Sequence, residues 1–221
     1  MAALKKTDWR TRQRAVSALG IIGSTTSIEA LLDVLNDPRQ EVRLETVKSL
    51  GKFVDPRILE SLIPLMADKS WRIRLKTIKV LETAGDQRLL EPMTSAVMDE
   101  CREVRLKAIS ALGNIADLPL KTIEVLITAL IDNDQDISFE ALRVLEEVGS
   151  PLVVPLVDYF ERNWQSLNRD MIRTFLTLLV SNTMTGEQLT PIEAFLTASI
   201  LTGTDDITKA ISKKLLARLK Q

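Results

Sequence analysis

Residues 99–113, DECREVRLKAISALG, belong to a pattern that recurs along the chain and decides its fold. Near-copies lie upstream at residues 37–51 and 68–82, and a more divergent copy lies at residues 8–20. One arginine sets the register of the copies, because it recurs at a step of 31 residues. The four arginines are Arg12, Arg43, Arg74 and Arg105. Repetition at this period indicates an array of stacked structural units, each of which contacts its neighbours.

Each copy is predicted to form an amphipathic helix. Its apolar residues follow one another at steps of two, three and three, which fits one face of a helix and not the strict alternation of a strand. Charged residues occupy positions between them, such as Glu45, Lys76 and Lys107. The three apolar stripes are Val42, Leu44, Val47 and Leu50; Ile73, Leu75, Ile78 and Leu81; and Val104, Leu106, Ile109 and Leu112.

A second, more apolar helix is predicted before each copy, for example at residues 27–36, 57–67 and 121–131. We call the helix that carries the arginine helix B and its predecessor helix A. Two short helices form a hairpin that cannot bury its apolar faces alone, whereas stacked hairpins share one core. The sequence therefore predicts an all-α fold, a right-handed α-solenoid (superhelix) of about six to seven antiparallel helical hairpins.

Proline falls inside three of the predicted A helices, at Pro64, Pro92 and Pro155. Because a proline in a helix interior removes a backbone hydrogen bond and clashes with the preceding turn, we expect each of these helices to bend there. We interpret the three prolines as sources of curvature and not as site residues.

The arginine register and the residues around it resemble HEAT repeats. The closest resemblance is to the short HEAT-like repeats of the phycobilisome-lyase type, with the consensus D-x(5)-R-x(6)-L-G. It spans about residues 8–148 and implies a single HEAT-like repeat domain over residues 1–221, with divergent C-terminal repeats and a cap at residues 150–221. It says little about activity, because such repeats occur in scaffolds, adaptors, transport factors and a few enzymes. The matching residues are Asp37, Arg43, Leu50 and Gly51; Asp68, Arg74 and Leu81; and Asp99, Arg105, Leu112 and Gly113.

The repeated arginine follows an apolar residue of helix B, so part of its side chain is expected to be buried. A buried guanidinium needs partners, and an aspartate lies six residues earlier in three copies. We therefore predict a structural ladder of Arg–Asp contacts between adjacent hairpins, with an anion site as the alternative. The ladder residues are Arg12, Arg43, Arg74 and Arg105 with Asp37, Asp68 and Asp99. In a later repeat, Ser138 takes the arginine position.

The composition excludes several kinds of catalytic site. The chain has no histidine and one cysteine, Cys101, which excludes histidine-based catalysis and makes a thiol nucleophile a poor hypothesis. HEAT-like deoxyhypusine hydroxylases bind two irons through His-Glu pairs, and this chain resembles them in fold only. The acidic stretch Asp132, Asp134 and Asp136 lacks the glycine and glutamate of a calcium loop. We predict no metal, no cofactor and no catalytic residue.

Charge and hydropathy limit the possible partners and the location of the protein. The net charge is −1, with +4 over residues 1–110 and −5 over residues 111–221, which does not fit a duplex-DNA binder. No apolar run reaches the length of a membrane span, and residues 1–10 have no signal-peptide core. One cysteine forms no internal disulfide, and we expect a cytoplasmic protein.

The first functional hypothesis is a non-catalytic scaffold or adaptor that binds another protein. In such arrays the B helices line the concave surface, so their charged residues would form the contact face. The basic middle of the chain, from Arg72 to Lys107, is where we expect an acidic segment of the partner. The candidate binding residues are Arg10, Arg14, Glu45, Lys48, Arg72, Lys76, Lys79, Lys107 and Trp71.

Two alternatives follow from the resemblance. Some relatives are subunits of bilin lyases or help to dismantle phycobilisomes, which implies handling of a tetrapyrrole or its acceptor protein. Basic residues could then hold propionates, and Trp71 could stack on the rings. The second alternative is a DNA-binding HEAT-like protein that resembles the HEAT-like DNA glycosylases, which cradle DNA on a basic concave face, although the acidic C-terminal half argues against it. The tryptophans Trp9, Trp71 and Trp164 either pack against a neighbouring hairpin or serve as binding hot spots.

Overall fold

The computed structural model describes residues 2–163, 171, 174, 175 and 178. Within these residues every regular element is a helix, which confirms the predicted all-α fold of repeated hairpins. The chain divides into two units, Met1–Ala116 and Asp117–Gln221. The handedness and the total number of hairpins concern the whole chain and stay predictions, as does its description as a single domain.

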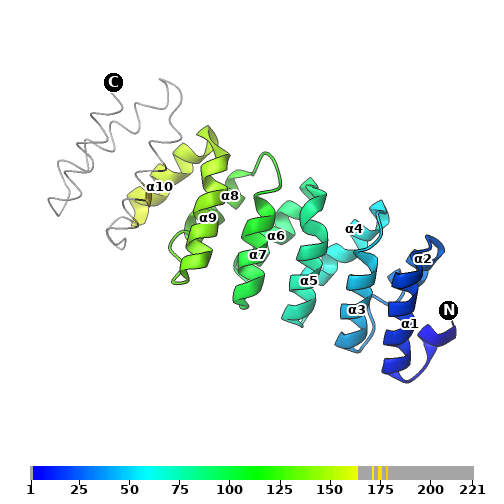
Figure 1. Cartoon of the computed structure of the whole chain (residues 1–221). Helices are drawn as coiled ribbons and strands as arrows, with labels where there is room; N and C mark the ends of the chain where they lie inside the picture. The colour runs from blue at the N-terminus through cyan, green and yellow to red at the C-terminus, as the bar shows by residue number, and fades with distance from the viewer. Residues whose placement is uncertain (1, 164–170, 172–173, 176–177, 179–221) are drawn as a thin grey trace, which may run out of the picture. The chain divides into compact units, whose positions relative to one another are not determined.

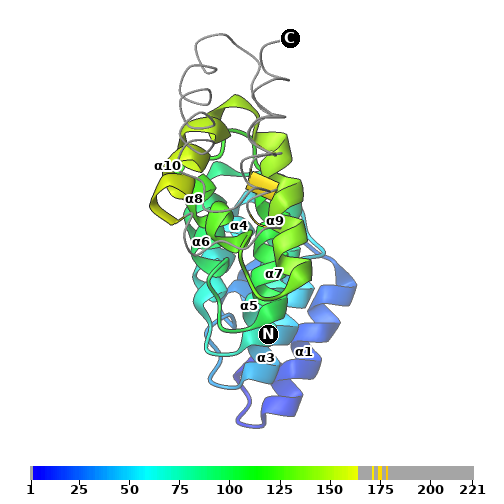
Figure 2. The same cartoon turned by 90° about the vertical axis from the view of Figure 1, so that its left-hand side faces the viewer.

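The first unit consists of two layers of helices (Figures 1 and 2). The B helices lie side by side in one layer, and the A elements form the other. The B layer contains α1 (Trp9–Ile22), α3 (Gln40–Leu50), α5 (Trp71–Leu81) and α7 (Arg102–Leu112). The A layer contains α2 (Thr26–Leu32), α4 (Pro56–Leu62) and α6 (Leu90–Ala96). Short 3-10 helices are η1 (Ala2–Lys5), η2 (Ile63–Ala67), η3 (Glu82–Ala84) and η4 (Gln87–Leu89).

The second unit begins with another hairpin, made of α8 (Leu120–Ala129) and α9 (Gln135–Val148), and continues through η5 (Ser150–Leu152) into α10 (Val153–Asn163). Tyr159 of α10 stacks on Phe175, with ring centres 5.6 Å apart. Burial raises the pKa of the Tyr159 hydroxyl. The divergent C-terminal repeats and cap predicted at residues 150–221 lie mostly outside the described residues.

Each of the three predicted B-helix stripes contains one residue that is not fully buried. Val42, Val47 and Leu50 of α3 are fully buried, as predicted. Leu44, in contrast, is only half-buried, and Thr46 is fully buried in its place. Thr46 lies one helical turn after Val42, so it shares the face toward the A layer, whereas Leu44 is turned away from it. Leu75 and Leu106 are half-buried in the same way.

Proline shapes the A elements differently from the prediction. The chain changes from α4 to the 3-10 helix η2 at Ile63, one residue before Pro64, so the expected single helix at residues 57–67 is interrupted. Pro92 and Pro155 are the third residues of α6 and α10. The prediction that they fall in helix interiors was wrong, because α6 and α10 begin later than expected. In the first turn a proline removes no intrahelical hydrogen bond.

The helix starts that carry an aspartate follow local sequence rules. Asp55 precedes Pro56 at the start of α4, and its carboxylate accepts a hydrogen bond from the Arg57 backbone N–H at 2.9 Å. Asp134 caps α9 by accepting from the backbone N–H groups of Asp136 and Ile137. The acidic stretch at this point therefore begins a helix, and within the described residues no acidic cluster has the form of a metal site.

The first two B helices pack at unusually close range. A Cβ atom added to Gly20 of α1 would lie 2.5 Å from the Ser49 Oγ of α3 and 2.6 Å from its Cβ. The Ser49 hydroxyl donates to the backbone carbonyl of Val16 at 3.3 Å. A glycine at position 20 is therefore required by the close approach of two helices.

Candidate functional site

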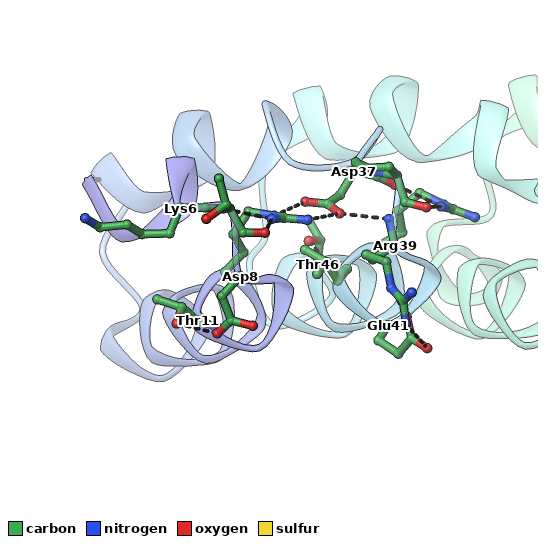
Figure 3. A network of polar contacts seen from close by, with 12 residues as sticks. Lys6, Asp8, Thr11, Asp37, Arg39, Glu41 and Thr46 are labelled. Carbon is green, nitrogen blue, oxygen red and sulfur yellow. Dashed lines mark hydrogen bonds and ion pairs between the residues drawn. The ribbon is translucent and has the colours of Figure 1, made fainter.

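The repeated arginines join neighbouring hairpins in the first unit. Arg43 Nε donates to Asp68 Oδ2 at 2.7 Å, and Arg43 Nη2 donates to Asp68 Oδ1 at 3.0 Å. The same two hydrogen bonds recur between Arg12 and Asp37 (Figure 3) and between Arg74 and Asp99. In every case the aspartate lies 25 residues after the arginine. This two-point geometry fixes both the distance and the orientation of adjacent repeats.

Each arginine also holds the turn of its own repeat. Arg43 Nη1 donates to the backbone carbonyl of Asp37 at 2.8 Å, six residues earlier. Arg74 and Arg105 donate in the same way to the carbonyls of Asp68 and Asp99. Asp68 therefore accepts from one arginine through its side chain and from the next through its backbone. We call this continuous set of contacts, from Arg12 to Arg105, the arginine ladder.

The contacts of Asp68 and Asp37 favour the ionised form of these two carboxyls. Burial opposes ionisation of Asp68, but hydrogen bonds from Arg43 and from the Ser70 N–H outweigh it, so the pKa of the Asp68 carboxyl is lowered. Asp37 behaves likewise, because Arg12 and the Arg39 N–H outweigh the effect of burial on its pKa.

The three paired arginines leave little capacity for another anion. The pKa of each guanidinium is raised, first by the hydrogen bond to its aspartate and against the opposing effect of burial. Because Nε, Nη1 and Nη2 of Arg12, Arg43 and Arg74 all donate within the chain, these contacts give no support to the anion-site alternative.

In the second unit Ser138 takes the arginine position and makes one of the contacts that the arginine makes in other repeats. Its hydroxyl is placed to donate to the backbone carbonyl of Asp132 at 2.9 Å, again six residues earlier. Asp132 accepts from the Asp134 N–H, as the ladder aspartates do from the residue two positions later. A short hydroxyl thus holds the turn of its own repeat without a guanidinium.

A second repeated set of ion pairs lies on the A layer and was missed from the sequence. Arg57 pairs with Asp55 and, at 2.6 Å, with Glu29 of the preceding repeat. Arg88 pairs in the same way with Asp86 and Glu60. The signal was present, since Asp-x-Arg recurs at the same step of 31 residues. These pairs are largely exposed, so they contribute much less to stability than the ladder.

Apart from Trp71, the predicted contact residues lie on the B helices at three equivalent positions per helix. We call these positions the B-helix face; they follow one another at steps of four and three, so they form one stripe on each helix. From the start to the end of each helix, the stripes are Arg10, Arg14 and Ser17 on α1; Glu41, Glu45 and Lys48 on α3; Arg72, Lys76 and Lys79 on α5; and Glu103, Lys107 and Ser110 on α7.

Three of the predicted contact residues already form ion pairs within the chain. Lys48 pairs with Glu45 on the same helix, with Nζ and Oε2 3.7 Å apart. Lys107 pairs with Glu82 at the end of the preceding hairpin. Their charges are partly neutralised, so they attract a partner less strongly than their number suggests.

The stripe on α5 is different. Arg72 and Lys79 are exposed and Lys76 is half-buried, and none of the three forms an ion pair with a carboxylate among the described residues. Arg10 and Arg14 of α1 are also exposed cations without such a pair. The structure therefore separates the arginines that hold the array from the cations that face solvent.

Two of the tryptophans begin B helices. Trp71 is the first residue of α5 and is 37% exposed, with the Arg72 guanidinium 4.8 Å from its ring centre. Trp9 begins α1 and lies within 5.0 Å of two guanidinium groups, from Arg10 and Arg39. Such contacts hold the indole at the edge of the B-helix face. Trp164 lies outside the described residues.

The remaining reactive group is not activated. Cys101 is half-buried, and its thiol donates to Glu103 Oε2 at 3.0 Å. Burial first, and then this hydrogen bond, raise the pKa of the Cys101 thiol. A nucleophilic cysteine requires the opposite shift, because the thiolate is the attacking species.

A hollow of about 310 Å³ at the start of α3 is open to solvent, and its arginines are not free to bind a ligand. Arg39 pairs with Glu41 and lies over Trp9, and Arg43 belongs to the ladder.

Among the described residues, every helix is too short or too polar to span a bilayer.

Comparison with known proteins identifies the type of repeat. A family model described as HEAT repeats matches residues 1–43, 28–101 and 90–172. No functionally curated protein matches the chain.

Several solved structures share the fold. An engineered protein is 20% identical with a TM-score of 0.64, over 100% of this chain and 67% of its own. A second engineered protein is 20% identical with a TM-score of 0.53, over 99% of this chain and 94% of its own. A designed armadillo repeat protein in complex with the peptide (KR)4 is 16% identical with a TM-score of 0.51, over 99% and 97% of the two chains. Identities this low show a common fold alone.

Proposed function

Because the chain belongs to the family of HEAT-repeat proteins, we propose that it is a non-catalytic scaffold that binds an acidic segment of another protein through its B-helix face. The observation that carries this proposal is the stripe of Arg72, Lys76 and Lys79. These cations contribute no ion pair to the described fold, whereas the neighbouring ladder arginines are fully engaged.

The geometry of the stripe suits an acidic segment. Positions i, i+4 and i+7 project on one side of a helix, so the three positive charges act together over about 10 Å. Trp71, at the start of α5, adds an exposed aromatic ring of the kind that is enriched in binding hot spots. Charge complementarity of this kind steers association and selects partners more than it adds affinity.

The solved structures support the class of function but not the sign of the partner's charge. One designed armadillo repeat protein is described in complex with the basic peptide (KR)4. A stacked helical array can therefore present a surface that fits a peptide. The acidic character of the segment proposed here comes from α5 itself.

The two other hypotheses gain no support from the described residues. A tetrapyrrole would need an enclosed cleft, and the hollow at the start of α3 is open to solvent and lined by engaged side chains. Duplex DNA would need a continuous basic track, and Glu41 and Glu45 of α3 interrupt the positive charge between α1 and α5. Both stay predictions from family resemblance, as does the cytoplasmic location.

The proposal is tested by reversing the charge of the stripe. A fluorescein-labelled peptide of eight glutamates separated by glycine and serine is titrated with the full chain, and its fluorescence anisotropy is measured at low salt. The double variant Lys76→Glu, Lys79→Glu is expected to bind at least about tenfold more weakly than the unmodified chain.

A matched control separates the stripe from net charge. Lys52 lies in the turn after α3 and Lys121 lies on α8; both are exposed and neither belongs to the B-helix face. The variant Lys52→Glu, Lys121→Glu therefore changes net charge equally and should keep most of the affinity. Equal losses in both double variants, or no binding to the unmodified chain, would contradict the proposal.

A further inference from the structure

The B-helix face carries a charge pattern across the helices as well as along them. Equivalent positions lie 31 residues apart, so Arg14 on α1, Glu45 on α3 and Lys76 on α5 occupy the same place on successive helices. The row before them, Arg10, Glu41 and Arg72, has the same order of signs. Both rows therefore read positive, negative, positive across three adjacent helices of the first unit.

The residues of these two rows do not form ion pairs with one another. Within the described residues Glu45 pairs with Lys48 on its own helix, and Glu41 pairs with Arg39 at the start of the same helix. Arg10, Arg14 and Lys76 form no such pair. The positive charges of α1 and α5 thus remain available to a molecule that crosses the three helices, and the half-exposed cations that pair with Glu41 and Glu45 neutralise these two carboxylates only in part.

We infer that the bound segment is an extended peptide that crosses α1, α3 and α5, with acidic residues on α1 and α5 and a basic residue on α3. This inference rests on the proposed function and deepens it. Packed helices lie about 8–10 Å apart, and an extended peptide in the polyproline II conformation advances about 3.1 Å per residue with three residues per turn. One helix step therefore corresponds to about three residues, and side chains three positions apart face the same side of the peptide, which gives the pattern D-x-x-K-x-x-D. This pattern reads the same in both directions, so it holds for either orientation of the peptide.

Labelled peptides of equal length test this pattern on the full chain. The matched peptide carries D-x-x-K-x-x-D and the all-acidic peptide carries D-x-x-D-x-x-D, with glycine and serine at every other position. The unmodified chain should bind the matched peptide at least about fivefold more tightly, because the all-acidic peptide places like charges together on α3. The variant Glu45→Lys should reverse this preference.

A second charge reversal serves as the control. Glu91 is exposed on α6 in the A layer, so Glu91→Lys changes the net charge equally without touching the rows. Reversal by Glu45→Lys with no reversal by Glu91→Lys supports the inference. An all-acidic peptide that binds as tightly as the matched one, with both losing affinity in Lys76→Glu, Lys79→Glu, overturns this inference and leaves the proposed function standing.

Two further outcomes are decisive. If neither peptide distinguishes the unmodified chain from the Lys76→Glu, Lys79→Glu variant, the proposed function itself fails. If sedimentation shows a dimer that Glu45→Lys dissociates, and the peptides show no preference, a second copy of the chain occupies the face and the inference is overturned.

Discussion

Arg43 and Asp68 join two neighbouring hairpins by two parallel hydrogen bonds, although 25 residues separate them in the chain. Side-chain exposures are only 15% and 6%, so the pair is largely shielded from water. The next arginine, Arg74, binds the backbone carbonyl of the same aspartate. One aspartate thereby links two arginines on successive helices, and the stacking of repeats depends on it.

Removing this aspartate should destabilise the array strongly. Asp68→Ala leaves the Arg43 guanidinium without its carboxylate, and breaking a well-shielded pair costs about 2–3 kcal/mol. The urea midpoint of unfolding, followed by far-ultraviolet circular dichroism, should fall accordingly. The control is Glu60→Ala, which removes an exposed partner of Arg88. A midpoint for Asp68→Ala equal to that of Glu60→Ala would refute the structural role of the ladder.

Stability should fall in acid in a way that depends on the ladder. The pKa values of Asp37 and Asp68 are lowered in the folded state. Their contribution is therefore fully present above the unfolded value of about 4, and it is lost as the pH falls through the folded values. The double variant Asp37→Asn, Asp68→Asn should be less stable at pH 7 and lose less stability between about pH 5 and pH 2. Parallel curves of unfolding free energy against pH would contradict this prediction.

Two equivalent threonines should respond differently to the same substitution. The Thr46 hydroxyl donates to the Val42 carbonyl at 2.9 Å, whereas the equivalent Thr77 hydroxyl is fully buried without a hydrogen-bond partner among the described residues. Thr77→Val removes an unsatisfied polar group and should stabilise the chain by about 1 kcal/mol. Thr46→Val should be neutral or slightly destabilising. Thermal unfolding of the two variants measures the difference, and an opposite order would contradict it.

The close approach of α1 and α3 gives a further test. In an exposed helix, glycine to alanine is stabilising, but a Cβ at Gly20 would collide with Ser49. Gly20→Ala should therefore destabilise the chain by about 1–3 kcal/mol. Adding Ser49→Gly should recover part of the loss in a double-mutant cycle. Additive destabilisation in that cycle would show that the two residues do not meet.

The repeat period, the hairpins and the helix starts could be predicted because they depend on local spacing. The B-helix stripes followed from apolar periodicity, and the helix predicted from residue 57 begins one residue earlier, at Pro56 of α4. The half-burial of Leu44 and the burial of Thr46 could not be read from hydrophobicity, because the direction of each side chain depends on where the A layer lies. The same holds for Pro92, whose position in the first turn of α6 depends on a helix boundary.

The sequence predicted which residues form the B-helix face, but it did not predict which of them form ion pairs. Sequence alone could not show that Lys107 pairs with Glu82, whereas Lys76 and Lys79 form no ion pair among the described residues. Pairing depends on side-chain reach across hairpins, which spacing does not determine. The ion pairs of Arg57 and Arg88 are the opposite case, since their Asp-x-Arg repeat at a step of 31 residues is visible in the sequence.

The most direct test combines affinity and stability in one experiment. The acidic peptide is titrated into the unmodified chain, into Asp68→Ala and into Lys76→Glu, Lys79→Glu, and the urea midpoint of each protein is measured beside its dissociation constant. The ladder variant should lose stability and keep the affinity of its folded fraction, whereas the stripe variant should keep its midpoint and lose at least about tenfold in affinity. If both properties fall together in both variants, the separation between arginines that hold the array and cations that meet the partner is contradicted.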